Sequence, residues 1–133
     1  MKELTDVQRQ ILEKVAGMTK MPTEGAYNLR LNGKGFVRHS SENIDIVPKE
    51  DKPGIDIYIK GATRGETVSI PVVISDSGLD DLVYNDFHIE DGADVTIVAG
   101  CGIHNCGCDD SRHNGIHTFY VGKNCNVRYQ EKH

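Results

Sequence analysis

The fold is decided by a stretch that occurs twice: NDFHIEDGADVTI at residues 85–97 and HTFYVGKNCNVRY at residues 117–129. Its apolar positions match in pairs, which are Phe87 with Phe119, Ile89 with Val121, Val95 with Val127 and Ile97 with Tyr129. Each copy reads as a strand, a tight turn with small residues, and a second strand. Such a unit must stack on its neighbours to bury its apolar face, so the repeat predicts a β-helix. A meander of hairpins is the alternative.

Similar short runs continue the pattern along the chain. A weaker third copy of the repeat is formed by residues 57–62 and 67–70. Alternating or β-branched runs predict strands at residues 27–31, 35–39, 44–47, 55–59, 67–75, 82–89, 95–99, 118–121 and 127–129. The predicted class is therefore mainly β, with stacked units in its second half.

The N-terminal segment predicts a short amphipathic α-helix. Thr5 and Gln8 have the spacing of a capping box. One apolar face follows from Val7, Ile11, Leu12 and Val15. We expect the helix to end near Gly17 and a linker to follow. The expected organisation is a helix and linker over residues 1–25 and a β-helix domain over residues 26–133.

Composition narrows the classes of function. The 133 residues suit one domain, and the net charge of −5 argues against a nucleic-acid surface, which needs clustered Lys and Arg. The sequence contains neither a signal-peptide pattern nor a run of about 20 apolar residues, so we expect a cytoplasmic protein without a membrane partner. Thiols stay reduced in that compartment, which makes the four cysteines candidate ligands rather than two disulfides.

Chemistry is concentrated between the two copies of the repeat, in residues 101–117. This segment holds three of the four cysteines and three of the six histidines. Thiolate and imidazole suit zinc, iron or an iron–sulfur cluster. The candidate ligands of a cluster or of iron are Cys101, His104, Cys106 and Cys108. The candidate ligands of a metal ion such as zinc are Cys106, Cys108, His113 and His117. The spacing is unlike the paired C-x-x-C knuckles of structural zinc sites.

Several of these residues also have a structural interpretation. Cys125 takes the turn position of Ala93, so we expect a small buried residue there rather than a ligand. Cys101 ends an apolar strand and could be buried in the same way. The histidines of the segment could be exposed or hydrogen-bonded. Three further histidines stand alone and are expected to form no site: His39, His88 and His133.

Enzymatic motifs are absent from the sequence. Walker and G-x-G-x-x-G loops do not occur, and neither does the zinc-deaminase pattern of H-x-E followed by P-C-x-x-C. ATP chemistry by this chain is therefore not expected. A cysteine- or zinc-dependent hydrolase remains an alternative that would require a deep pocket at residues 101–117.

Four stretches resemble the SufB/SufD family of iron–sulfur cluster assembly proteins: SIPVVIS (residues 69–75), YNDF (residues 84–87), VTIVAGCGIHN (residues 95–105) and HTFYVG (residues 117–122). The resemblance is closest to the short SufB-like members of bacteria and archaea. It runs from about Tyr27 to the end, and residues 100–105 are its most specific part. It implies a right-handed parallel β-helix, a SufC-like ATPase and a SufB/SufD-like subunit as partners, and a non-catalytic scaffold on which clusters are built.

The chain also differs from the members of that family at its C-terminal end. Members of that family continue beyond the position of His133 into further β-helix rungs and a helical region that docks the ATPase. The chain is therefore expected to be the N-terminal portion of such a protein, truncated within its β-helix. An open last rung has unpaired strand edges, which predict self-association or a separate chain that completes the helix. The alternative function is a structural or interaction β-helix that binds no cluster, or that binds zinc through its Cys/His segment.

Overall fold

Strands make up most of the described part of the chain. The computed structural model describes residues 5–6, 8–10, 25–75, 78–103 and 111–132. In these ranges the strands are β1 (Ala26–Leu31), β2 (Lys34–His39), β3 (Ile44–Pro48), β4 (Gly54–Ile59), β5 (Arg64–Ile74), β6 (Asp80–Ile89), β7 (Asp94–Ile103), β8 (Arg112–Val121) and β9 (Asn126–Lys132). The predicted mainly β class is confirmed.

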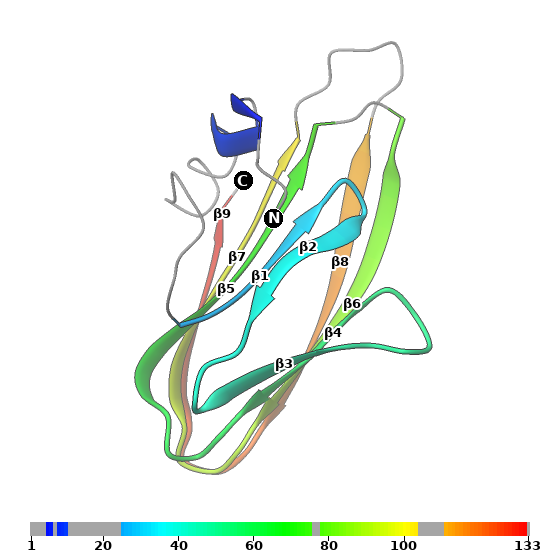
Figure 1. Cartoon of the computed structure of the whole chain (residues 1–133). Coiled ribbons are helices and arrows are strands. Elements are labelled where there is room, and N and C mark those ends of the chain that lie inside the picture. The colour runs from blue at the N-terminus through cyan, green and yellow to red at the C-terminus, as the bar shows by residue number, and fades with distance from the viewer. Residues whose placement is uncertain (1–4, 7, 11–24, 76–77, 104–110, 133) are drawn as a thin grey trace.

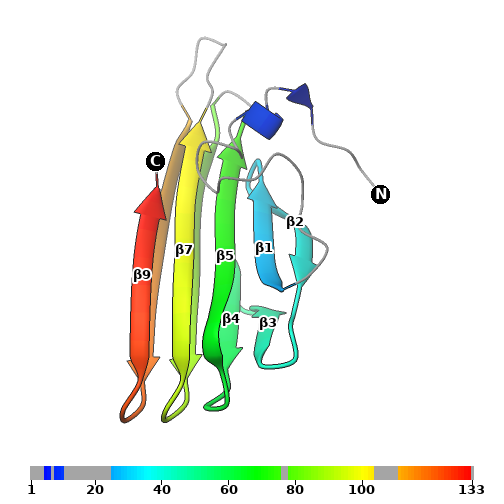
Figure 2. The same cartoon turned by 90° about the vertical axis from the view of Figure 1, so that its left-hand side faces the viewer.

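The strands form two facing sheets (Figures 1 and 2). One has the order β2-β1-β5-β7-β9, which we call sheet A, and the other has the order β3-β4-β6-β8, which we call sheet B. Both sheets are mixed, because the β1/β2 and β3/β4 pairs are antiparallel and the remaining pairs are parallel. Within the described ranges neither sheet closes on itself.

The second half of the chain repeats one unit three times, as predicted. Each unit crosses from sheet B to sheet A through a tight turn: β4 to β5, β6 to β7 and β8 to β9. The strand register matches the sequence repeat, since Phe87 pairs with Phe119 and Ile97 pairs with Tyr129. The weaker third copy is confirmed as well, because Ile57 pairs with Phe87.

The turns stack on one another at one end of the strands (Figure 2). Gly92 and Asn124 take equivalent places and both have a positive φ, of 82° and 57°, a conformation that Gly and Asn adopt at little cost. The amide of Asn126 donates to the carbonyl of Ala93 at 2.8 Å, and the amide of Asp94 donates to that of Thr63 at 3.0 Å. Backbone hydrogen bonds therefore join each turn to the next.

The core lies between the sheets and follows from the period of two in each strand. Fully buried side chains come from both sheets, among them Ile57 and Phe87 of sheet B and Val68 and Ile97 of sheet A. In the last unit the equivalent apolar side chains are covered on one side only. Phe119 and Tyr129 are each 38% exposed, and Val121 is 52% exposed. The stacked core therefore ends in an apolar layer that is open to solvent.

The N-terminal capping box is confirmed by two reciprocal hydrogen bonds. The amide of Thr5 donates to Gln8 Oε1 at 2.9 Å, and the amide of Gln8 donates to Thr5 Oγ1 at 3.2 Å. Helical backbone follows at Gln8 to Gln10. The side-chain amide of Gln8 also donates to Ser75 Oγ at 3.0 Å, beyond the end of β5. The rest of the predicted helix and the boundary at residue 25 stay predictions, because residues 11–24 lie outside the described ranges.

Two sequence expectations need correction. The strands predicted at residues 95–99 and 118–121 are longer than expected, because β7 extends to Ile103 and β8 begins at Arg112, so Cys101, His113 and His117 all lie in strands. Strand β5 begins at Arg64 rather than at residue 67, and its pairing with β7 contains a register shift between Arg64 and Glu66. The described residues form no helix with the length and apolar character needed to cross a membrane.

Candidate functional site

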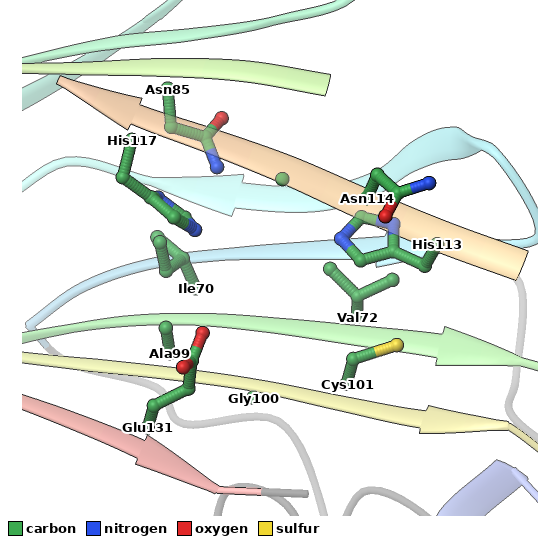
Figure 3. A pocket seen from close by; sticks show the side chains of 11 residues that line it. Ile70, Val72, Asn85, Ala99, Gly100, Cys101, His113, Asn114, His117 and Glu131 are labelled. Carbon is green, nitrogen blue, oxygen red and sulfur yellow. The ribbon is translucent and has the colours of Figure 1, made fainter. Parts of the chain in front are cut away.

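A cavity of about 130 Å³ lies between the two sheets, beside the last unit (Figure 3). Its apolar wall comes from Ile70, Val72 and Ala99. Its polar side chains are Asn85, Cys101, His113, Asn114, His117 and Glu131. Small-molecule sites usually enclose about 300–1,000 Å³, so this cavity suits an ion with a few bound atoms better than an organic substrate.

Four of the lining side chains carry donors that bind metals. Cys101 comes from β7, His113 and His117 from β8, and Glu131 from β9 (Figure 3). The pairing of parallel strands brings these distant segments together, and the pleat sends alternate residues of each strand toward the other sheet. A thiol, two imidazoles and a carboxylate therefore line one space.

The imidazoles of His113 and His117 border one space because Gly115, which lies between them on β8, has no side chain. A Cβ atom at Gly115 would lie 3.0 Å from His117 Nε2 and 3.6 Å from His113 Nε2. Both Nε2 atoms are therefore close to one point in the cavity wall, and Figure 3 shows the two rings turned toward each other. A glycine at this position leaves room for an ion or a small ligand between them.

Cys101 is a half-buried free thiol. Burial, together with the charge of nearby Asp81, raises the pKa of the Cys101 thiol to about 11. The thiol is therefore protonated at neutral pH, which makes it a poor nucleophile. A thiophilic metal ion could still bind it by displacing the proton.

His117 lies among aromatic rings at the open end of the core. Its ring centroid is 6.0 Å from that of Phe87 and 5.9 Å from that of Tyr129. Burial lowers the pKa of His117 despite the opposing charge of Glu131, so the imidazole is neutral at physiological pH. Its Nδ1 atom is buried and has no hydrogen-bond partner among the described residues. A neutral imidazole with an unused nitrogen is a suitable metal ligand.

Glu131 is linked to Tyr129 on the same strand. The Tyr129 hydroxyl donates to Glu131 Oε1 at 3.3 Å. Burial of Tyr129 and the adjacent carboxylate raise the pKa of the phenol to about 12. The phenol therefore stays a hydrogen-bond donor that steadies the carboxylate beside the cavity.

His113 belongs to a buried ion-pair network. Its Nδ1 atom is 3.0 Å from Asp81 Oδ2, and the Arg30 guanidinium donates to both Asp81 oxygens, at 2.9 and 2.8 Å. Arg30 lies on β1 of sheet A and Asp81 on β6 of sheet B, so the network also ties the two sheets together.

The structure brings together three of the predicted site residues: Cys101, His113 and His117. The predicted ligands His104, Cys106 and Cys108 lie outside the described residues. Cys125 is half-buried in its turn, packs against the core and donates its thiol to the carbonyl of Glu90 at 3.1 Å, in keeping with the small structural residue expected there.

Three polar side chains that line the cavity were not predicted from the sequence: Asn85, Asn114 and Glu131. Glu131 follows the second copy of the repeat with the strand's period of two, after Val127 and Tyr129. Asn85 was aligned with His117 at the first position of the repeat. Asn85 and Glu131 could have been predicted by extending the alternation of inward-facing residues along each strand.

A second cluster lies on the outer face of sheet B, and it contradicts the expectation that His88 stands alone. His88 Nε2 is 3.1 Å from Asp56 Oδ1, and the ligand atoms of Asp56, Asp86 and His88 all lie within 4.8 Å of one another. Lys49 Nζ is already 3.0 Å from a carboxylate oxygen of each aspartate. Because an ammonium group takes the place of a cation there, we interpret this cluster as a structural ion-pair network.

The inter-sheet cavity is therefore the better candidate for function. Its donors favour iron or zinc, which accept thiolate, imidazole and carboxylate together. No protein-family model, no curated protein and no solved structure matches the chain.

Proposed function

We propose that the protein is a non-catalytic scaffold component of SUF-type iron–sulfur cluster assembly, and that the inter-sheet cavity accepts iron as cargo. The observation that carries this proposal is the gathering of Cys101, His113, His117 and Glu131 around one small cavity. The partners proposed are a SufC-like ATPase and a SufB/SufD-like subunit, which rest on the sequence resemblance alone.

The residues around the cavity suit iron. Thiolate, imidazole and carboxylate are all iron ligands in proteins. The space beside Gly115, which a single Cβ would narrow, lies next to both Nε2 atoms. His117 also has a buried Nδ1 atom with no hydrogen-bond partner in the part of the chain that the structure describes. Binding to Cys101 would release its proton, so the affinity for iron should rise with pH.

The proposed function also implies a more specific fold than two facing mixed sheets. We take the three stacked units as part of a right-handed parallel β-helix, a view supported by the parallel pairing of β4, β6 and β8 and of β5, β7 and β9. The open apolar layer of Phe119, Val121 and Tyr129 supports a subunit contact at that end.

Anaerobic reconstitution with ferrous iron and sulfide tests the proposal. We expect charge-transfer absorption in the wild type and its loss in Cys101→Ser. A Cys106→Ser/Cys108→Ser variant asks whether those two cysteines contribute as well. Cys125→Ser is the matched control, because that thiol is bound in a turn, and it should behave as the wild type does. Absorption no stronger than a protein-free control would exclude a cluster on this chain.

Zinc is the second candidate cargo, since the same donors bind it. The metal content of the wild type and of Cys101→Ser, both purified without a His tag, distinguishes a zinc site from a purely structural or interaction role. Stoichiometric zinc that is lost in the variant would favour a zinc site. Protein free of metal that also fails reconstitution would favour a purely structural or interaction role.

A further inference from the structure

His113 is held by a buried carboxylate on the neighbouring strand. His113 and Asp81 are paired in the register of β8 and β6, and Nδ1 lies 3.0 Å from Asp81 Oδ2. The side chains are 10% and 5% exposed, so little water competes for this contact. The ring position of His113 is therefore set by one specific partner.

Asp81 is held in its ionised form. Its carboxylate forms a two-point ion pair with the guanidinium of Arg30, which is permanently charged and therefore favours the ionised form. Arg30 donates to both carboxylate oxygens and also to the carbonyl of Gly33 at 2.7 Å. An ionised carboxylate only accepts hydrogen bonds. The Nδ1 atom of a neutral His113 must therefore carry the proton.

The opposite ring nitrogen faces the cavity. With the proton on Nδ1, the lone pair of a neutral imidazole is on Nε2. That atom lies 3.6 Å from the point where a Cβ of Gly115 would stand, beside Nε2 of His117. We propose that Asp81 is a positioning residue that fixes the Nδ1–H tautomer of His113 and so presents Nε2 as a ligand for a divalent transition-metal ion in the cavity.

This inference rests on the proposed function in one respect, namely that the cavity binds a metal. Carboxylates that hold a ligating histidine in this way set its tautomer and increase its basicity, and their removal weakens metal binding by about 10- to 100-fold. Arg30 completes the arrangement because it offsets the charge of Asp81 and fixes both oxygens.

The chain offers a matched control on the other face of the same sheet. His88 also contacts an aspartate, Asp56, but through Nε2, and Lys49 shares that carboxylate. Asp56→Asn therefore removes a carboxylate–imidazole contact of the same kind without touching the cavity.

The first test uses metal-free, ¹⁵N-labelled protein and needs no metal binding. Long-range ¹H–¹⁵N spectra at mildly alkaline pH distinguish the two neutral tautomers, and a His113→Gln variant assigns the signal. We expect Nδ1–H in the wild type and in Asp56→Asn, and a loss of that preference in Asp81→Asn. A His113 that is Nε2–H in the wild type, or a tautomer unchanged in Asp81→Asn, would overturn the proposal.

The second test titrates metal-free protein with Co²⁺, whose visible spectrum reports coordination. Asp81→Asn should bind about 10- to 100-fold more weakly than the wild type, and Asp56→Asn equally well. Because Asp81→Asn leaves Arg30 buried without its partner, the Arg30→Gln/Asp81→Asn variant is titrated as well and should show the same loss. Equal Co²⁺ affinity in folded variants would overturn the positioning role. A wild type that binds no Co²⁺ yet has the Nδ1–H tautomer would count against the cavity as a metal site and not against the tautomer.

Discussion

The thiol of Cys101 should react slowly with electrophiles in the metal-free protein. Its pKa of about 11 means that little thiolate exists at neutral pH, roughly 100-fold less than for a thiol of pKa 9. We therefore predict slow alkylation of Cys101 by iodoacetamide at neutral pH, with a rate that rises steadily until the pH approaches 11. Peptide mass spectrometry of timed samples measures the rate at this cysteine. Rapid alkylation at neutral pH would show that burial does not protect the thiol.

Gly115 gives a way to close the site without removing a ligand. A methyl group there would lie 3.0 Å from His117 Nε2, so Gly115→Ala should push the imidazoles apart and weaken Co²⁺ binding by at least about tenfold. Calorimetric titration measures the affinity. Gly35→Ala is the control, because Gly35 lies on exposed β2 and its added methyl group would contact only the end of Arg38. Undiminished binding in Gly115→Ala would place the metal elsewhere.

At the level of residues, prediction from sequence succeeded where chemistry was local. Cys101, His113 and His117 were found because they crowd one segment of the chain. The cluster of Asp56, Asp86 and His88 was not predicted because Asp56 comes from a different unit than the other two residues and becomes their neighbour only through strand register. Extending the third copy of the repeat by one residue would have placed Asp56 beside Asp86.

Among the elements, β4 and β6 are joined on their outer face by Lys49. Its ammonium group holds the carboxylates of Asp56 and Asp86, which are each 22% exposed. Lys49→Met should leave two adjacent carboxylates without their cation and lower the free energy of unfolding by about 1–3 kcal/mol. Urea unfolding measures the loss. Lys34→Met, on exposed β2, should change it by less than about 0.5 kcal/mol. Equal effects of both substitutions would mean that the network contributes little.

All nine predicted strands exist, because hydrophobic alternation and turn residues are local signals. Their ends were less predictable. Strand β5 starts earlier than expected because the register shift at Arg64 and Glu66 accommodates polar residues that do not alternate with apolar ones. Strand β8 starts earlier because Arg112 to His117 pair with β6, and that pairing depends on a partner strand far along the chain.

For the molecule as a whole, the open apolar layer should drive association. Phe119 and Val121 belong to β8 and Tyr129 belongs to β9, and each of these strands is paired on one side only within the described residues. We predict that the protein self-associates and that Val121→Lys weakens this at least about tenfold, since a charge would be buried in the contact. Sedimentation velocity over a range of protein concentrations measures the self-association of the wild type and of the variant.

Tyr120→Lys is the matched control for that prediction. Tyr120 is 55% exposed, as fully as Val121, but it points to the outer face of sheet B, where it stacks on His88. Its substitution should leave the association unchanged. A wild type that stays monomeric at high concentration would contradict the prediction.

The three tight turns have equal lengths, and this sets where the chain can gain or lose residues. Four residues separate Ile59 from Arg64, Ile89 from Asp94 and Val121 from Asn126, whereas the connections after β5 and β7 differ in length. One inserted residue in a turn would invert the next strand, sending its inner side chains to solvent. Viable insertions and deletions should therefore fall at the other end of the strands. That end contains the start of β8 and the last residues of β7, so natural length variation would reshape the rim of the cavity while the core stays intact.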